Sequence, residues 1–360
     1  MITIKDIAKE ANVSEGTIDR VLHNRGGVSK KTEEKIKKIL HKHSFSVNPV
    51  ASALAMKNKF QIAALIPKHN ATDLFWKSPL LGILKASEEV KNSGIQTTNY
   101  AFNHYSPLSY LNTFKALLKT KPTAVIIVPI FLKETKLIVK QLEELDIPYI
   151  FLNIDIKGFN NFAFIGQDSY TAGYIAGKLM HLSLPEQSTF LIIQSKHNFT
   201  ENNAIIKRIE GFNDYFIKNN IKEETLTLKI ENLNNLVETT QKINSFLKQH
   251  HTIKGVFVPS SRISIIIDSI DETYLKKLRM IGFDNTPQNI DCLKNDTVSF
   301  LISQKPFDQG YESIRLITDF LLKKKTPKNK VYLPIDILTK ENVAYNERNE
   351  FLFENENDNS

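Results

Sequence analysis

The sequence predicts an α/β protein in which an all-α helix-turn-helix headpiece precedes a two-lobed, doubly wound α/β core. Three observations predict this division. Residues 3–24 carry two short amphipathic helical patterns that meet across a tight turn. From residue 60 onward, apolar runs alternate with longer amphipathic stretches, which is typical of parallel sheets covered by helices on both faces. Positive charge is concentrated in residues 1–60, which hold twelve Lys and Arg against six Asp and Glu.

The first two helices are justified by their apolar spacing. Thr3 is a suitable N-cap, and one helical face follows it at the spacing i, i+3, i+4 and i+7, formed by Ile4, Ile7, Ala8 and Ala11. Asn12 and Val13 break the pattern, and Ser14 can cap a second helix. That helix turns Ile18, Val21 and Leu22 inward. Its other side carries Glu15, Gly16, Asp19 and Arg20. Two helices joined in this way form a helix-turn-helix, whose second helix lies in the major groove of DNA.

This segment resembles the start of bacterial repressors of the lac and galactose repressor family. The resemblance rests on Thr3, Asp6, Ala8, Ala11, Val13, Ser14, Thr17, Arg20, Val21 and Leu22. It continues through Val28 and Ser29, where that family begins a third helix, supported here by Ile36, Ile39 and Leu40. The sequence departs from the family at Asn12, Asp19 and Val47, where Gly, Ser and Pro are usual. A small bundle that binds a protein is the alternative, but the concentrated positive charge favours DNA.

The resemblance implies roles for residues of the headpiece. Arg20 is the candidate for a bidentate guanine contact, and Glu15 and Gly16 occupy the other base-facing positions. The candidate phosphate contacts are Thr17, Arg25 and Ser29, and Thr3 and Ser14 complete the predicted DNA-binding residues of the headpiece. Beside a phosphate backbone Asp19 would need a salt bridge to Arg20 or Arg25, or else the helix reads an operator unlike the one common in the family.

Residues 48–55, NPVASALA, predict a short helix, because Asn48 can cap it and Pro49 suits its first position. In the resembled family this segment is a hinge helix that becomes ordered on operator DNA. Ala51 and Leu54 stand at the matching positions, and Leu54 would be the apolar wedge in the minor groove. The alternative is that Leu54 is a linker residue packed against the body.

Composition excludes several classes of protein. A hydrophobic content of 41% in 360 residues is enough for a sizeable core, yet no stretch is apolar enough to span a membrane. The N-terminus has no hydrophobic export core, so we expect a cytoplasmic protein. Cys292 is the only cysteine, which excludes an intrachain disulfide and a cysteine metal cluster. No HExxH or phosphate-loop motif occurs, and we expect no metal and no cofactor.

The core is predicted from its alternating pattern. Strands are expected at 60–66, 95–101, 124–128, 148–152, 188–193, 255–258, 279–283 and 298–303. Helices are expected at 80–92, 106–119, 133–144, 169–182, 203–219, 235–249, 262–276 and 307–323. These units are too many for one small open sheet, so we expect two lobes, as in the periplasmic-binding-protein-like effector domain of the resembled family.

The expected domain bounds follow from these elements and from the resemblance. A headpiece would cover 1–46, a hinge helix and linker 47–59, and an effector-binding and dimerisation domain 60–345. The family's chain crosses three times between lobes, here near 164, 296 and 327. The N-lobe would hold about 60–163 and 297–326, and the C-lobe about 165–295 and 328–345. Residues 346–360 would form a polar tail.

Doubly wound sheets bind ligands at the carboxyl ends of their strands. The loops at these ends supply the candidate effector-binding residues, which are Phe75, Trp76, Asn153, Asp155, Asn203, Ser260, Arg262, Asp284 and Gln304. Aromatic faces beside amides and acids suit a sugar. Asp284 and Gln304 also resemble ligand-contacting positions of the family and its ribose-binding relatives. Arg262 stands where an acid is common, so we infer a carbohydrate or related polyol effector, either neutral or with a negative charge, rather than a simple neutral pentose.

Together these patterns predict a ligand-gated transcriptional regulator of the repressor type, acting as a homodimer on a pseudo-palindromic operator. A solute-binding sugar receptor would share the two lobes, but it would have no use for residues 1–55. An enzyme on the same fold is a further alternative. The histidines and loop acids do not form a nucleophile or metal set by spacing, which argues against catalysis.

Overall fold

The computed structural model describes residues 3–22, 26–43, 45, 60–70, 74–195 and 203–345, apart from the side chain of Asn203. The chain divides into two compact units, Met1–Asn58 and Lys59–Ser360. The predicted hinge residues Asn48, Ala51 and Leu54, and the predicted phosphate contact Arg25, lie outside the described residues.

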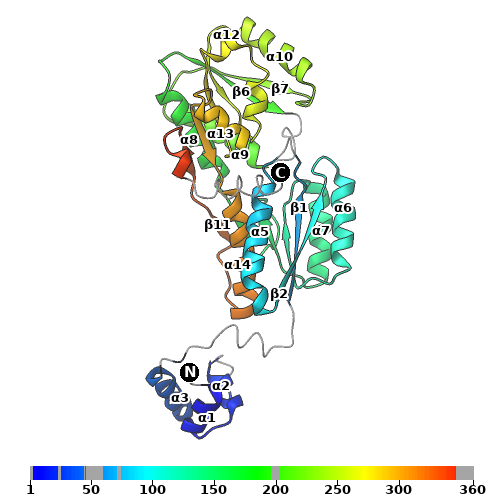
Figure 1. Ribbon diagram of the computed structural model, residues 1–360, viewed down its shortest axis with the longest axis vertical. Helices are drawn as coiled ribbons and strands as arrows, with labels where there is room; N and C mark the ends of the chain where they lie inside the picture. The colour runs from blue at the N-terminus through cyan, green and yellow to red at the C-terminus, as the bar shows by residue number, and fades with distance from the viewer. Residues whose placement is uncertain are drawn as a thin grey trace. The chain divides into compact units, whose positions relative to one another are not determined.

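The described part of the first unit contains three helices, α1 (Ile4–Ala11), α2 (Glu15–Leu22) and α3 (Lys30–Lys42) (Figure 1). Thr3 caps α1 in a reciprocal capping box with Asp6, and Asn12 ends the helix in the left-handed conformation at φ 57°. The apolar faces of all three helices meet in one small core, formed by Ile7, Ala8, Ala11, Ile18, Val21, Ile36 and Ile39. The predicted helix-turn-helix and its inward face are therefore confirmed.

Polar contacts tie the end of α3 to α1. Lys35 Nζ donates to the backbone carbonyl of Ala11 at 2.9 Å. Glu10 lies 2.8 Å from Lys42 Nζ and 2.7 Å from His43 Nε2, through its two carboxylate oxygens. The hydrogen bonds from Lys42 and then His43 lower the pKa of Glu10. These contacts fix α1 and α3 against each other, and α2 packs against both helices.

The described part of the second unit contains two six-stranded sheets. The N-lobe sheet has the order β11-β5-β4-β3-β1-β2 and is parallel throughout. Its strands are β1 (Phe60–Pro67), β2 (Ile95–Phe102), β3 (Ala124–Ile127), β4 (Tyr149–Leu152), β5 (Ala163–Gly166) and β11 (Lys330–Tyr332). The C-lobe sheet has the order β12-β10-β9-β8-β6-β7, in which β12 runs antiparallel to β10. Its strands are β6 (Thr189–Ser195), β7 (Thr225–Ile230), β8 (Ile253–Phe257), β9 (Arg279–Phe283), β10 (Phe300–Ser303) and β12 (Asp336–Leu338).

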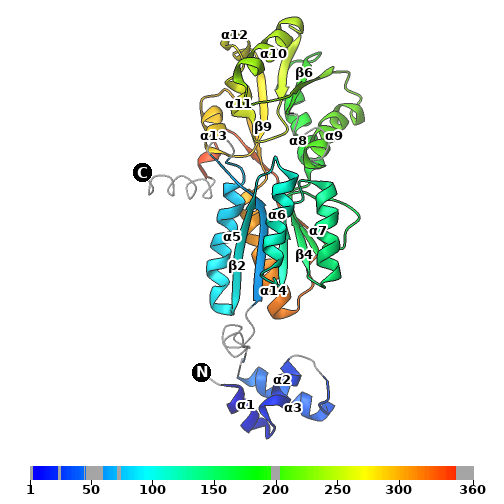
Figure 2. The same cartoon turned by 90° about the vertical axis from the view of Figure 1, so that its right-hand side faces the viewer.

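Helices cover both faces of each sheet, as predicted (Figure 2). On the N-lobe sheet, one face packs against α5 (Lys77–Val90) and α14 (Pro306–Lys323), and the other against α6 (Pro107–Leu118) and α7 (Leu132–Glu144). On the C-lobe sheet, α8 (Ser169–Leu182) and α9 (Asn203–Lys218) cover one face. The other face is covered by α10 (Leu236–Gln249), α11 (Ile263–Ile267) and α13 (Pro287–Lys294).

The predicted helix at 262–276 is wrong. The structure has α11 and a separate short helix, α12 (Glu272–Leu275). Asn244 of α10 explains the break, because its Nδ2 donates to Ser269 O at 3.1 Å and its Oδ1 accepts from Asp271 N–H at 2.9 Å. These bonds take backbone groups that a continuous helix would use. The sequence prediction also missed α13 and the strands β5, β7, β11 and β12.

The crossings between lobes lie later than the predicted 164, 296 and 327. Because β5 pairs with β4 in the N-lobe sheet, the chain leaves this lobe only at 167–168. Because β10 pairs with β9, residues 300–303 belong to the C-lobe, and the second crossing lies at 304–305. The third lies at 333–335, since β11 pairs with β5 and β12 with β10. Strand pairing, which the prediction lacked, sets all three positions.

Glycines allow a pair of helices in each lobe to touch through their backbones. A Cβ on Gly82 of α5 would lie 2.0 Å from Phe307 O of α14, and one on Gly310 would lie 2.0 Å from Pro79 O. In the C-lobe, a Cβ on Gly173 of α8 would lie 1.9 Å from Arg208 O of α9. Glycine is the residue that permits such close approach.

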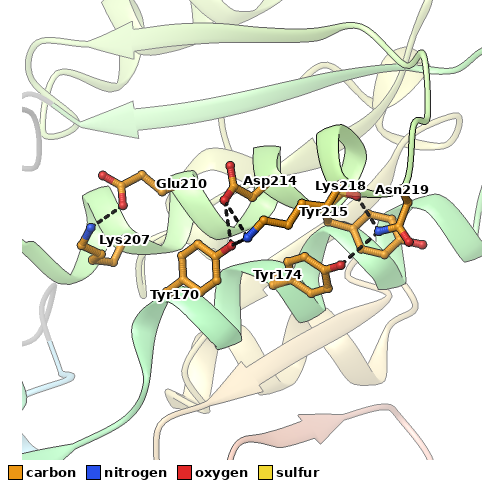
Figure 3. A network of polar contacts seen from close by, with 8 residues as sticks. All are labelled: Tyr170, Tyr174, Lys207, Glu210, Asp214, Tyr215, Lys218 and Asn219. Atoms are coloured by element: carbon orange, nitrogen blue, oxygen red, sulfur yellow. Dashed lines mark hydrogen bonds and ion pairs between the residues drawn. The ribbon is translucent and has the colours of Figure 1, made fainter.

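A polar network lies on the same α8–α9 pair. Tyr170 Oη donates to Asp214 Oδ2 at 2.7 Å, and Lys218 Nζ donates to Tyr170 Oη at 2.6 Å. Figure 3 shows these side chains between the two helices. The hydrogen bonds from Tyr170 and then Lys218 lower the pKa of Asp214. These contacts add hydrogen bonds between α8 and α9, whose close approach Gly173 already permits.

Candidate functional site

The outer face of α2 is the candidate DNA-binding surface. Ile18 and Val21 are buried against α1 and α3, so Glu15, Gly16 and Arg20 are left exposed on the opposite side. Gly16 has no crowded neighbour, because a Cβ there would lie 3.8 Å from the nearest atom, Ser14 Oγ. The predicted base-facing residues therefore share one accessible face.

The predicted phosphate contacts Thr17 and Ser29 and the predicted DNA-binding residue Ser14 lie at the beginnings of α2 and α3. Ser14 Oγ accepts from Thr17 N–H and Ser29 Oγ accepts from Thr32 N–H, each at 3.2 Å. Helix N-termini of this kind also favour phosphate, because their backbone N–H groups and dipoles point outward. Thr3 is exposed at the start of α1, where its hydroxyl is held by Asp6.

Gly27 leaves room for Arg20. It has a left-handed φ of 75°, and a Cβ there would lie 3.2 Å from Arg20 Nη1. A larger residue would be strained in this conformation and would crowd the guanidinium.

In the core, polar side chains at the carboxyl ends of β4 and β9 are joined through the second crossing segment. Asn153 follows β4, Asp284 follows β9, and both adopt left-handed φ values of 69°. Asn153 Nδ2 donates to Gln304 Oε1 at 3.2 Å, and Gln304 Nε2 donates to Asp284 Oδ1 at 2.8 Å. The structure thus brings three of the predicted effector-binding residues into one buried chain that links the lobes.

A buried arginine lies next to this chain. Arg208 of α9 stacks over Phe283 at 4.0 Å from its ring centre, and its Nη1 donates to Pro259 O at 2.9 Å. Burial lowers the pKa of Arg208 to about 10, and the charge of Asp284 opposes this shift. Arg208 therefore remains cationic at neutral pH, and its Nε lacks a hydrogen-bond partner among the described residues.

Residues of both lobes line a small hollow that opens to solvent. Its lining consists of Leu74, Phe75, Lys77, Ser78, Asp284, Asn285, Thr286, Pro287 and Pro306. Trp76 packs edge-on against Phe75, with ring centres 4.9 Å apart. Phe75 and Asp284 thus supply an aromatic face and a carboxylate to one pocket, which is the combination that suits a polyol.

Other predicted residues have partners elsewhere. Asp155 forms an ion pair with Lys330 of β11. Arg262 Nη2 donates to Tyr105 Oη at 2.9 Å, which joins the C-lobe to the segment after β2. Ser260 is half-buried, and Asn203 begins α9 with a side chain outside the described residues. The predicted set is therefore only partly assembled.

Two polar residues beside these groups were absent from the predicted set. Gln309 of α14 is fully buried, accepts from Asn153 Nδ2 at 3.1 Å and donates to the backbone carbonyl of Gln304 at 2.9 Å. Arg208 is the other. Both lie on apolar faces of their helices, Gln309 beside Gly310 and Arg208 between Ile205 and Phe212. A lone polar residue at an inward position was the available signal.

The described residues contain neither a membrane-spanning helix nor a cluster of metal ligands. No helix among them is both long and apolar enough to cross a bilayer. Within the same residues, no three His, Cys, Asp or Glu side chains gather where they could hold a metal ion.

Comparison with known proteins identifies both units. Residues 3–48 match the family described as bacterial regulatory proteins, lacI family, and residues 62–325 match the periplasmic binding protein domain. The ribose operon repressor of Halalkalibacterium halodurans is 25% identical over 97% of this chain and 99% of its own. The regulator TreR of Salmonella typhimurium is 43% identical over 58 residues, which is 16% of this chain and 18% of that protein.

A solved structure extends the comparison to the core. A Bacteroides fragilis protein described as a candidate LacI transcriptional regulator superposes with a TM-score of 0.74 at 30% identity, over 80% of this chain and 99% of that one. The fold, the matched families and these relatives lead to one conclusion. The chain belongs to the lacI family of bacterial regulatory proteins, as a DNA-binding transcriptional regulator with a periplasmic-binding-protein-like domain, and it is not an enzyme.

Proposed function

We propose that this regulator is a repressor whose affinity for its operator is controlled by a small carbohydrate-like effector. The proposal rests on two features that occur in one chain. A recognition helix has an exposed outer face, and the two lobes of the core line a pocket with an aromatic face and a carboxylate. The relative named ribose operon repressor matches along nearly the whole chain, which supports a sugar-related role. The protein would act in the cytoplasm as a homodimer on a pseudo-palindromic operator.

The proposed division of labour keeps the predicted bounds. Residues 1–46 bind DNA, 47–59 form the hinge helix and linker, 60–345 bind effector and dimerise, and 346–360 form a polar tail. Arg20 contacts a guanine, and Glu15 and Gly16 face neighbouring bases. Phosphate contacts come from the residues that cap or flank the helices, which are Thr3, Ser14, Thr17, Arg25 and Ser29. Asn48, Ala51 and Leu54 belong to the hinge helix that meets the minor groove.

The proposed effector site is the pocket between the lobes. Phe75 and Trp76 would cover an apolar sugar face, while Asn153, Asp284 and Gln304 would meet its hydroxyl groups. Ser260 and Asn203 lie at the carboxyl ends of C-lobe strands and complete the proposed set. Asp155 and Arg262 would have to leave Lys330 and Tyr105 to contact the effector.

Operator selection from random DNA, with the purified full-length protein, tests this function. We expect a pseudo-palindromic site, and we expect one or more members of a panel of neutral and acidic sugars to change its affinity. A chain that lacks residues 1–58 should keep sugar binding and lose specific DNA binding. Failure to enrich any sequence would contradict the proposal, and so would effector binding that is restricted to purines or peptides.

A further inference from the structure

In the hydrogen-bonded chain between the lobes, the acceptor groups at the two ends determine how each side-chain amide is oriented. At one end, Gln304 meets the carboxylate of Asp284, and a carboxylate only accepts hydrogen bonds. At the other end, Gln309 meets the backbone carbonyl of Gln304, which also only accepts. Both glutamines must therefore turn their NH₂ groups toward these acceptors, and both present Oε1 to the same neighbour.

That neighbour is Asn153, whose amide is oriented by the two glutamines. Its Nδ2 lies 3.2 Å from Gln304 Oε1 and 3.1 Å from Gln309 Oε1. An amide nitrogen has two hydrogens, so both donors of Asn153 are used. The opposite orientation would place Oδ1 against two other oxygens without a hydrogen between them, which is unfavourable in a buried site.

Only the carbonyl oxygen of Asn153 is left for another molecule. No described residue donates a hydrogen bond to Asn153 Oδ1, although Asn153 keeps 7% exposure at the carboxyl end of β4. We propose that Gln309 is a positioning residue that locks Asn153 as an acceptor-only position of the effector site. This proposal rests on the proposed function and deepens it, because the effector must donate a hydrogen bond there.

The effector class follows from this polarity. A hydroxyl or an ammonium group can donate to Asn153 Oδ1, whereas an ionised carboxylate or phosphate cannot. Asp284, which is 2% exposed and lines the pocket, is joined to Asn153 through Gln304 and is also a hydrogen-bond acceptor. Hydroxyl groups of a polyol therefore fit here, and an acidic group of the effector would have to lie elsewhere in the pocket.

Acidic isosteres test the lock, because a carboxylate has the same shape as the amide but cannot donate. In Asn153→Asp the oxygen that replaces Nδ2 would face both Gln304 Oε1 and Gln309 Oε1, and in Gln309→Glu the oxygen that replaces Nε2 would face Gln304 O. When it is protonated, the acid restores the hydrogen bond lost in Gln309→Glu and one of the two lost in Asn153→Asp, so its pKa in the folded state is raised above its unfolded value. Stability is then fully present below the unfolded pKa and is lost as pH rises through the folded pKa.

The measurement is the melting temperature of each full-length variant, relative to wild type, at pH 7.5 and pH 5. We expect a deficit of about 3–8 °C at pH 7.5 that shrinks by at least half at pH 5. Asp284 would raise the pKa of the new acid and Arg208 would lower it, but both are present in every variant. Gln288→Glu, at an exposed position of α13, is the matched control and should change little at either pH.

Each result decides the proposal. A deficit that is equal at the two pH values, or larger at pH 5, would show that Asn153 does not donate to the glutamines. A variant that is unfolded at pH 7.5 and folds at pH 5 supports the lock, and one that stays unfolded at both contradicts it. These measurements need no effector, so they stand whether or not the proposed function does.

A second measurement addresses the effector itself. In calorimetric titrations with the sugar panel, Asn153→Ala should weaken the binding of a neutral polyol by about tenfold or more. Weakened binding of acidic sugars alone would overturn the acceptor-only assignment. Absence of binding by every sugar to wild type would instead count against the proposed function.

Discussion

Arg20 is the residue whose position bears most directly on DNA recognition. It is exposed on α2, while its neighbour Val21 is buried in the headpiece core, so the helix cannot rotate to hide it. Gly27 lies beside it and leaves the guanidinium free to extend. A fixed backbone and an extended guanidinium are what a bidentate guanine contact requires.

We expect Arg20→Ala to weaken operator binding by about 1–3 kcal/mol and to relax specificity at one base pair in each half-site. The reason is that a base contact discriminates between sequences, whereas a phosphate contact does not. Binding assays on a set of single-base operator variants would measure both effects. Lys38→Ala, at an exposed site of α3, is the comparison, and equal weakening on every operator by Arg20→Ala would make Arg20 a phosphate contact.

At the scale of residues, polar site residues that follow strands were easier to predict from the sequence than those that lie within helices. Asn153, Asp284 and Gln304 follow strands, where the topology of a doubly wound sheet directs attention, and the structure joins them. Gln309 and Arg208 contact the same groups from within helices, where inward positions are usually apolar. The partner of Arg262 was also unpredictable, because Tyr105 is 157 positions away along the chain.

At the scale of elements, the crossing of α5 and α14 at two glycines sets how closely these helices pack in the N-lobe. Gly82 and Gly310 face each other's backbones, and both helices contribute to the core on one side of the sheet. No side chain intervenes that could change rotamer to absorb a substitution.

Gly310→Ala should therefore lower the free energy of unfolding by about 2–4 kcal/mol, because its Cβ would overlap Pro79 O unless the helices moved apart. Urea unfolding followed by circular dichroism would measure the change. Glu312→Ala, two positions along α14, also places an alanine in this helix but introduces no overlap, and it serves as control. A stability equal to that of the control would mean that the crossing can open freely.

Elements with a strong apolar period were predictable, and those defined by pairing were not. The runs at β1 and β9 and the amphipathic pattern of α14 stand out in the sequence. By contrast, β11 and β12 have three residues each and depend on β5 and β10 for their hydrogen bonds. The break between α11 and α12 depends on Asn244, which lies on a different helix.

At the scale of the whole molecule, effector binding and operator binding must be coupled. The coupling is a free energy, and it need not be carried by any single contact. If an effector changes the affinity of the protein for operator by some factor, operator must change the affinity for effector by the same factor. This holds for any path between the two units.

We expect calorimetric titration of the effector, with and without saturating operator DNA, to give a ratio of affinities equal to the ratio measured for operator with and without effector. A non-operator duplex at the same ionic strength is the control, since phosphate binding depends strongly on salt. Unequal ratios would mean that oligomeric state changes during one of the titrations.

The number of units and their kind were predictable at this scale, because the charge distribution and the change of period both divide the chain near residue 60. The positions of the lobe crossings were not, since a strand gives no sign in its own sequence of which sheet it joins. Residues 300–303 illustrate this, as their apolar run would suit either lobe.

The glycine crossings also determine where the core can deform. Helices that are in backbone contact cannot slide past each other without losing that contact. The pair α5 and α14 and the pair α8 and α9 are therefore rigid parts of their lobes. Relative motion of the lobes is then left to the three short connections at 167–168, 304–305 and 333–335. We therefore expect a ligand that contacts both lobes to change the angle between them while each lobe keeps its internal packing.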